Sequence, residues 1–153
     1  MPGYGIAKKD AGMMEWARLS NRLARAHNYW IITTRPDGRP HAAPVWGIWM
    51  DEVFYFSTGA RSIKGHNLAR NRSLVVHLES GDDVVILEGT AERVKDRGRL
   101  LKINRVYGAK YKIYPLGKSG KGKLLGPFFA LQVRVAFCWL ERNFVKSSTR
   151  WVF

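Results

Sequence analysis

Residues 30–81 read WIITTRPDGRPHAAPVWGIWMDEVFYFSTGARSIKGHNLARNRSLVVHLESG, and this stretch decides the fold. Three of its segments, residues 30–35, 40–50 and 53–57, are rich in β-branched and aromatic residues, which is typical of strands. A fourth such run, residues 74–79, follows the segment TGARSIKGHN. Because that segment combines glycine with hydroxyl and cationic side chains, it predicts a phosphate site presented by a small β-barrel.

Turn residues separate the first predicted strands. Pro36, Asp37 and Gly38 favour a hairpin turn, because proline fixes φ and an Asp-Gly pair accepts positive φ. Asp51 begins a second turn before the third strand. Pro44 lies inside the second strand and removes a hydrogen-bond donor from the ladder, so we expect a sheet edge or a bulge at that position.

Outside this stretch the pattern predicts flanking helices and further strands. Leu19 and Leu23 have helical spacing, which predicts a helix over residues 11–27, capped by Asp10 and ended by a left-handed Asn28. The remaining predicted elements are helices over residues 62–70 and 96–107, an irregular segment over 108–127, and strands over 84–93, 128–140 and 149–153. We therefore predict a mainly β fold, a β-barrel of about six strands with flanking helices. Residues 10–153 would form this single domain after an N-terminal arm, residues 1–9.

The chain is strongly basic. Its 153 residues carry a formal net charge of +14, which attracts anions such as nucleic acid, acidic lipids or phosphorylated ligands. Residues 93–123 hold eleven Lys and Arg and only one acid, Asp96, and so contribute +10 of that charge. This local excess predicts a basic face, although a solvated helix and loop without a partner remains an alternative.

Several classes of function lack support in the sequence. With Cys138 as its one cysteine the chain cannot form an internal disulfide, which indicates a reducing compartment. We see no signal peptide and no apolar run of membrane-spanning length, so we expect a cytoplasmic protein without a membrane partner. The four histidines lack metal-ligand spacing, so no metal site is expected.

Residues 117–123, GKSGKGK, match part of a nucleotide-binding P-loop. Leu124 stands where Ser or Thr would hold magnesium, no apolar strand precedes the motif, and Pro127 opposes a following helix. A flexible basic loop is the better interpretation.

A nucleophile elbow of the form G-x-S-x-G is also missing, and no catalytic acid or base can be identified.

An anion site is predicted where residues 62–70 begin a helix. Thr58 and Gly59 would let the backbone approach a ligand, and the helix would offer free amides and the positive end of its dipole. Lys64 adds a point charge and Arg61 a two-pronged donor. The alternative is ordinary helix capping by Ser62 with the cations exposed to solvent. A second candidate is the strand around Ala43, where small residues would let a flat ring approach.

These segments together resemble the split-barrel flavin and deazaflavin oxidoreductases, the superfamily that includes pyridoxamine 5'-phosphate oxidase. The resemblance is strongest to the branch that uses the deazaflavin coenzyme F420. It is carried by residues 30–47 and 56–68, by VHLESGDDVVILEG at residues 76–89, and by the terminal TRWVF. The chain departs from the common pattern in its basic loop, residues 108–126, and this leaves the substrate unidentified.

The resemblance implies a six-stranded split barrel that forms a homodimer with two cofactor sites at the dimer interface. Arg61, Ser62 and Lys64 would bind the cofactor phosphate, and Thr58 and Asn67 would lie near the ribityl chain. The rest of the implied cofactor site comprises Ala43, Pro44, Val45 and Trp46 along the ring, Ser57 and Ile63 beside the phosphate residues, and Arg150 and Trp151, which would reach the partner's site.

The expected function is hydride transfer between coenzyme F420 and an unsaturated or conjugated small molecule. F420 carries a phosphodiester and an oligoglutamate tail, so a basic groove suits it better than it suits flavin mononucleotide (FMN). The alternatives are an FMN enzyme of the pyridoxamine-phosphate oxidase type and a non-catalytic binder of cofactor or nucleic acid. Nucleic acid is ranked last, although Tyr107, Tyr111 and Tyr114 interleave with lysines as a stacking surface would.

Overall fold

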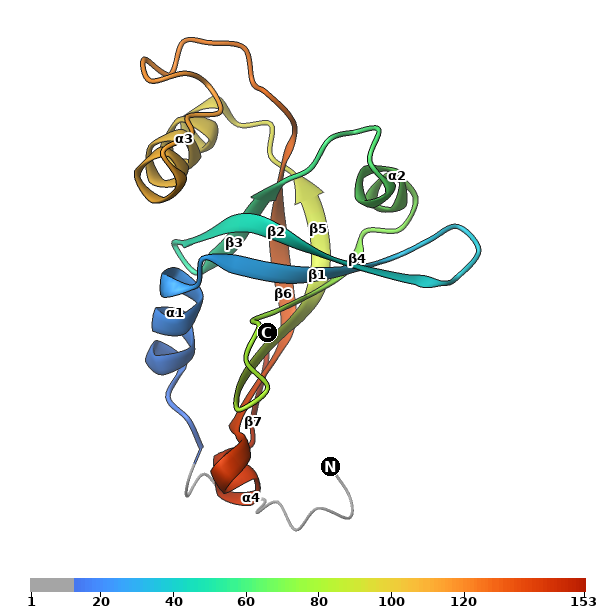
Figure 1. Ribbon diagram of the computed structural model, residues 1–153, viewed down its shortest axis with the longest axis vertical. Coiled ribbons are helices and arrows are strands. Elements are labelled where there is room, and N and C mark those ends of the chain that lie inside the picture. Colours follow the sequence, from blue (N-terminus) through green and yellow to red (C-terminus); the bar gives the residue numbers. More distant parts are fainter. Residues whose placement is uncertain (1–12) are drawn as a thin grey trace.

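The computed structural model describes residues 13–153, in which six antiparallel strands close into a barrel (Figure 1). The strands are β1 (Asn28–Thr34), β2 (Pro40–Met50), β3 (Val53–Ser57), β4 (Ser73–His77), β5 (Asp83–Arg93) and β6 (Phe128–Leu140). Their order is β3-β2-β1-β4-β5-β6, and pairing of β3 with β6 closes the ring. A short extra strand, β7 (Thr149–Val152), pairs with the outer part of β6. The predicted six-stranded, mainly β barrel is confirmed.

The longest strand, β6, joins three parts of the sheet. It pairs with β5 along its length, with β3 through Phe128–Leu131 and with β7 through Val135–Cys138. The β5–β6 register shifts between Glu88 and Gly89. A Cβ on Gly89 would collide with the carbonyl of Gln132, so glycine is required where the bulge brings the two backbones together.

The two hairpin turns form as the turn residues predict. Gly38 has a φ of +84° in the β1–β2 turn, where Asp37 also accepts a hydrogen bond from the Arg39 amide at 3.1 Å. Asp51 and Glu52 both have positive φ, 51° and 59°, between β2 and β3. Two successive left-handed residues match the right-handed twist of a two-residue hairpin. Because neither residue is glycine, the left-handed conformation lowers the stability of the fold.

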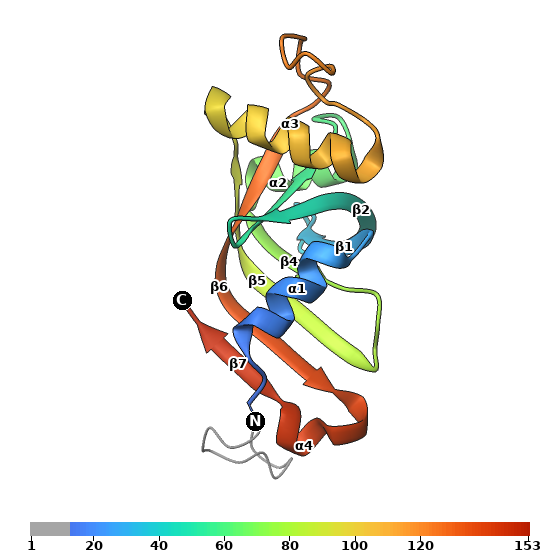
Figure 2. The same ribbon diagram turned by 90° about the vertical axis from the view of Figure 1, so that its left-hand side faces the viewer.

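Two apolar clusters of the described residues hold the helices against the barrel. The barrel interior, which includes Phe54 and Phe56, packs against Leu19 and Leu23 of α1 (Trp16–Arg25). The second cluster lies beneath α3 (Arg97–Tyr111). Its buried members from the helix are Leu100, Ile103, Tyr107 and Tyr111, which pack on Ile48, Tyr55 and Phe128. Figure 2 shows α1 and α3 on one side of the barrel, whereas α2 (Ile63–Arg70) lies on the other.

Three predictions of helix boundaries were wrong. The first helix begins at Trp16 with Glu15 as its N-cap, not at residue 11, and it ends at Arg25 with Ala26 as its C-cap, because Asn28 already pairs with Trp46 in the sheet. The third helix continues past Tyr107 to Tyr111, because Gly108 leaves room for the ring of Tyr114 to pack on the helix. The structure also contains a short 3-10 helix (Glu141–Asn143) and α4 (Phe144–Ser147), which the sequence did not predict. Asp10 and the predicted N-terminal arm lie outside the described residues, and because the helix begins at Trp16, the prediction that Asp10 caps it was wrong.

Candidate functional site

The connection from β3 to α2 forms a tight loop held by hydroxyl groups. The Ser62 hydroxyl accepts from the Gly65 amide at 3.0 Å and donates to the Gly59 carbonyl at 2.7 Å. Thr58 and Ser62 are 2.9 Å apart through their hydroxyl oxygens. Ser62 is therefore the N-cap of α2, as the capping interpretation predicted, and its hydroxyl is occupied within the loop.

Capping by Ser62 leaves other donors at the start of α2. Among the described residues, the amides of Ile63 and Lys64 have no hydrogen-bond partner, and the first turn contains no acidic residue. The Arg61 side chain is exposed and Lys64 is half-buried. Two unpaired amides, the positive end of a helix dipole and two cations fit a phosphate group, so these residues suit the phosphorylated cofactor that the resemblance implies.

Gly65 lets the helix approach the loop. A Cβ on Gly65 would lie 2.8 Å from the Ala60 carbonyl oxygen and closer still to that of Gly59. Because these neighbours are backbone atoms, no side chain fits between α2 and the loop without moving one of them. The close approach fixes where the amides of Ile63 and Lys64 point.

Asn67 ties α2 to the barrel instead of facing solvent. Its side-chain amide donates to the Thr33 hydroxyl at 2.9 Å, and the Asn67 side chain is buried. The Thr33 hydroxyl in turn lies 3.4 Å from the His41 carbonyl oxygen on β2. The predicted contact of Asn67 with a ribityl chain stays a prediction. The observed contacts connect the start of α2 to the strand that carries Ala43.

The predicted ring-lining residues lie on a free edge of the sheet. Within residues 13–153, the first half of β2 pairs with β1 only, and β3 begins to pair at Gly47. Pro44 stands opposite Trp30 in a continuous register, so the edge predicted at this proline is present and no bulge is formed. Val45 is buried, whereas Trp46 is 42% exposed. Ala43 is half-buried and Pro44 is exposed beside them.

A buried polar cluster supports the end of this edge. Lys110 donates through Nζ to the Tyr29 hydroxyl and to the Gly47 carbonyl, both at 2.9 Å. The Tyr111 hydroxyl accepts from the Gly47 amide at 3.0 Å, and its ring stacks on Trp46 with centroids 4.8 Å apart. The amide and the carbonyl of Gly47 are therefore both hydrogen-bonded to side chains of α3, and this fixes the position of the exposed Trp46 ring.

Burial changes the protonation of this cluster. It lowers the pKa of the Lys110 ammonium to about 8 and raises the pKa of Tyr111 to about 12. Burial, and then the proximity of Tyr111, also raise the pKa of Tyr29. This cluster was not predicted from the sequence. The spacing of Tyr107 and Tyr111 across Gly108 was a usable signal that the helix extends this far.

The predicted site residues do not all line one cavity. Ser57 and Thr58 help to line a hollow of about 280 Å³ together with Tyr107 of α3 and Leu125 of the basic loop. The Ser57 hydroxyl donates to the Pro127 carbonyl at 3.0 Å, so the end of the basic loop is attached beside the start of the α2 loop. A larger hollow of about 580 Å³ is lined in part by Ala60, Gly65 and Pro127, and none of the predicted site residues lines it.

Arg150 and Trp151 lie far from α2 within the same chain. They belong to β7, which lies at the opposite end of the barrel in Figure 1. Arg150 is exposed, and the ring of Trp151 packs edge-to-face on Trp16 with centroids 5.3 Å apart. The expected contact with a partner's site stays a prediction.

The P-loop lookalike is built differently from a nucleotide-binding loop. It follows the C-terminal end of α3 and leads into β6. Asn104 accepts from the Leu116 amide at 2.7 Å and donates to the Gly117 carbonyl at 3.0 Å, and Arg97 donates to the Gly120 carbonyl at 2.7 Å. These contacts attach the loop to α3, and the interpretation as a basic loop is confirmed.

Residues 13–153 contain neither a cluster of potential metal ligands nor a helix fit to cross a membrane. This part of the chain brings together no group of three or more His, Cys, Asp and Glu side chains with metal-binding geometry. None of its helices combines the length and the apolar character needed to cross a bilayer.

The comparisons with known proteins agree on one fold. The sequence model of the family described as pyridoxamine 5'-phosphate oxidase matches residues 18–140. A conserved hypothetical protein from Mycobacterium tuberculosis superposes with a TM-score of 0.75 at 22% identity, over 89% of this chain and 91% of that one. No curated protein matches the sequence.

Two other similar structures have names that refer to cofactors. An F420 reductase has a TM-score of 0.60 at 21% identity, over 76% of this chain and 94% of its own. The FAD binding protein from Mycobacterium smegmatis has a TM-score of 0.59 at 16% identity, over 92% of this chain and 98% of its own. At these identities the likeness shows a shared split-barrel fold.

Proposed function

This chain belongs to the pyridoxamine 5'-phosphate oxidase family of split barrels, and on that basis we propose that it is an oxidoreductase that uses coenzyme F420. Its substrate would be an unsaturated or conjugated small molecule. The observation that carries the proposal is the start of α2, where two unpaired amides stand beside Arg61 and Lys64. This arrangement suits a phosphodiester.

The residues around α2 would hold the cofactor. Lys64 and Arg61 neutralise the phosphate, and the amides of Ile63 and Lys64 donate to its oxygens. The hydrogen bond between Asn67 and Thr33 keeps this helix in a fixed position relative to β2. Ala43 and Pro44 lie on the free edge of that strand, where the unpaired backbone accommodates a flat ring.

When bound, reduced F420 supplies a hydride to an electron-poor acceptor. The contribution of the chain is positioning and electrostatics, which is the usual division of work in cofactor enzymes. Ordered groups that hold two reactants in a near-attack pose supply at best roughly 7–11 kcal/mol of the barrier reduction. The exposed face of Trp46, stacked on Tyr111, gives a rigid aromatic wall at the end of the edge.

The charge of the neighbouring loop supports F420 over FMN. The loop contains Lys118, Lys121 and Lys123, all exposed, and its end is hydrogen-bonded to Ser57. FMN ends in a single phosphate, whereas F420 continues into a polyanionic tail. A set of exposed cations on a loop that ends beside Ser57 favours the longer anion.

The family pattern supports assembly as a homodimer. In that arrangement Arg150 and Trp151 of one protomer reach the cofactor of the other. They lie at the end of the barrel opposite α2 in the same chain, which is consistent with a contribution across an interface (Figure 1).

Parallel titration of the apoprotein with F420 and with FMN tests the proposal. We expect the fluorescence of F420 to respond with a dissociation constant at least tenfold lower than that of FMN. Lys64→Ala weakens F420 binding at least tenfold, whereas Lys146→Ala, an exposed lysine on α4, leaves it unchanged. Tight binding of FMN with no response to F420 overturns the choice of cofactor. An unchanged affinity in Lys64→Ala overturns the phosphate assignment.

A further inference from the structure

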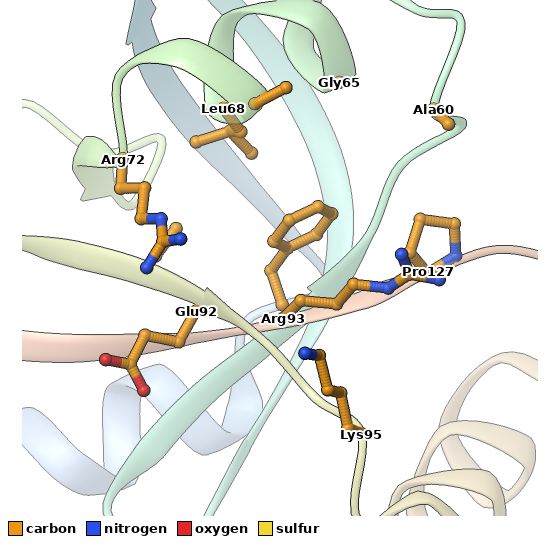
Figure 3. A pocket seen from close by; sticks show the side chains of 11 residues that line it. Ala60, Gly65, Leu68, Arg72, Glu92, Arg93, Lys95 and Pro127 are labelled. Carbon is orange, nitrogen blue, oxygen red and sulfur yellow. The ribbon is translucent and has the colours of Figure 1, made fainter.

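A hollow lies between α2, the end of β5 and the start of β6 (Figure 3). Its volume is about 580 Å³, which is within the usual range for pockets that bind small molecules. Its lining includes Ala60 and Pro127 but not Ser57 or Thr58. None of the residues assigned above to the cofactor contributes to its lining.

Three cations surround this cationic hollow. They are Arg72, before β4, and Arg93 and Lys95, at and after the end of β5. None of the three forms an ion pair or a side-chain hydrogen bond with any residue of the described part of the chain. Figure 3 shows Arg93 and Lys95 at the same end of the hollow.

The single acid of the lining does not neutralise these cations. The carboxylate of Glu92 points away from Arg93 and Lys95 in Figure 3, because successive residues of β5 face opposite sides. Unpaired cations gathered around one concavity create a positive potential that an anion relieves. Arginine adds a planar pair of donors that matches a carboxylate or phosphate.

The inner wall of the hollow is apolar and well packed. Leu68 and Ala91 are buried, and Phe129 packs against the barrel core with its ring 5.6 Å from that of Phe56. Gly65 and Ala69 expose no polar side chain on the helix side. Such a surface gives no reason to bind a hydrated inorganic ion but stabilises a hydrocarbon body placed against it.

We propose that the cationic hollow binds a small amphipathic anion. Its carboxylate or phosphate would contact Arg93 and Lys95, with Arg72 on the far side, and its apolar body would lie on Leu68 and Phe129. The site does not depend on the cofactor assignment, because it uses different residues. Ala60 and Gly65 line it from behind the loop that carries Arg61, so its occupant would contact the same loop from the other face.

Calorimetric titration of the apoprotein with hexyl phosphate, hexanoate and 1-hexanol tests this proposal. The two anions are expected to bind and the alcohol, which has the same chain without the charge, to bind at least tenfold more weakly. Repeating the titration on Lys64→Ala separates this site from the cofactor site, since binding in the hollow survives that substitution.

Two variants of the hollow and one matched control complete the test. Arg93→Gln with Lys95→Gln should weaken anion binding at least tenfold. Ala69→Trp should do the same by filling the space while keeping every cation. Arg142→Gln with Lys146→Gln removes the same charge from exposed positions in and just before α4, which lies at the far end of the barrel from α2, and should change binding less than twofold. Equal affinity for 1-hexanol, an equal loss in the control, or full binding in both hollow variants overturns the proposal.

Discussion

Asn67 of α2 and Thr33 of β1 form a hydrogen bond of 2.9 Å, and each residue is only 1% exposed. The two residues are separated by 34 positions in the sequence, yet this contact sets where the candidate phosphate helix stands on the barrel. A buried polar pair of this kind is costly to break, because the remaining partner has no water to bond to.

Thr33→Val should therefore lower the free energy of unfolding by about 1–3 kcal/mol, since it leaves the Asn67 amide without an acceptor in the interior. Urea denaturation measures this change. Thr34→Val is the matched control, because Thr34 is half-buried on the opposite face of the same strand. A loss no larger than that of the control would show that the hydrogen bond does not contribute to stability.

Asp51→Gly should stabilise the protein by about 0.5–1 kcal/mol. Asp51 has a φ of +51°, where a side chain costs roughly 1–2 kcal/mol, and the greater freedom of glycine in the unfolded chain offsets part of the gain. Thermal unfolding checks the change. Asp82→Gly, in a turn where the residue does not have a positive φ, should bring no gain, and an equal gain in both variants would contradict the strain at Asp51.

Lys110 should make stability rise with pH above pH 8. In the unfolded chain its ammonium keeps the proton up to about pH 10.4, whereas burial lowers its pKa to about 8 in the fold. Between these values the unfolded state binds more protons, so the free energy of unfolding increases with pH. Below pH 8 the full cost of burying the charge remains.

Lys110→Met isolates this contribution. Urea unfolding at pH 7, 8.5 and 9.5 should show the wild type gaining stability relative to the variant as pH rises. Tyr29, Tyr111 and Cys138 have raised pKa values and oppose the gain at high pH, but they are present in both proteins. A constant difference across this range would mean that Lys110 keeps its ordinary pKa in the fold.

Cys138 should be unreactive in the native protein. The thiol is 1% exposed, and burial followed by the nearby Asp83 raises its pKa to about 11. The thiolate is the reactive form, so a disulfide reagent at pH 8 should react roughly a hundredfold more slowly than with the unfolded chain. Cys138→Ala with Ser119→Cys, an exposed loop position, is the control and should react rapidly. Equal rates would place the native Cys138 in contact with solvent.

The sequence predicted the strands better than the sites. β2, β3 and β6 have the predicted bounds, because alternating side chains and turn residues such as Asp37 and Gly38 are local signals. The predicted end of α3 was wrong. Gly108 continues the helix because the ring of Tyr114 packs against it, and this contact is not visible in the sequence.

The sites depend on contacts between distant segments. The capping role of Ser62 becomes visible only through its hydrogen bonds, and the anion site predicted beside it stays a prediction. The Lys110 cluster joins α3 to β1 and β2 across 81 and 63 residues, and no local pattern encodes it. The cationic hollow likewise forms only when residues near 65, 93 and 129 converge.

The barrel cannot close until β6 exists, and this has a kinetic consequence. The last ring contact joins β3 to Phe128–Leu131, and the Ser57 bond to Pro127 spans 70 residues. Closing so long a loop costs conformational entropy before the contact stabilises the chain, so closure is expected to be slow. During synthesis the edges of β3 and β5 that pair with β6 stay unpaired until residues 128–140 are made, and this exposes both edges to aggregation and to chaperones.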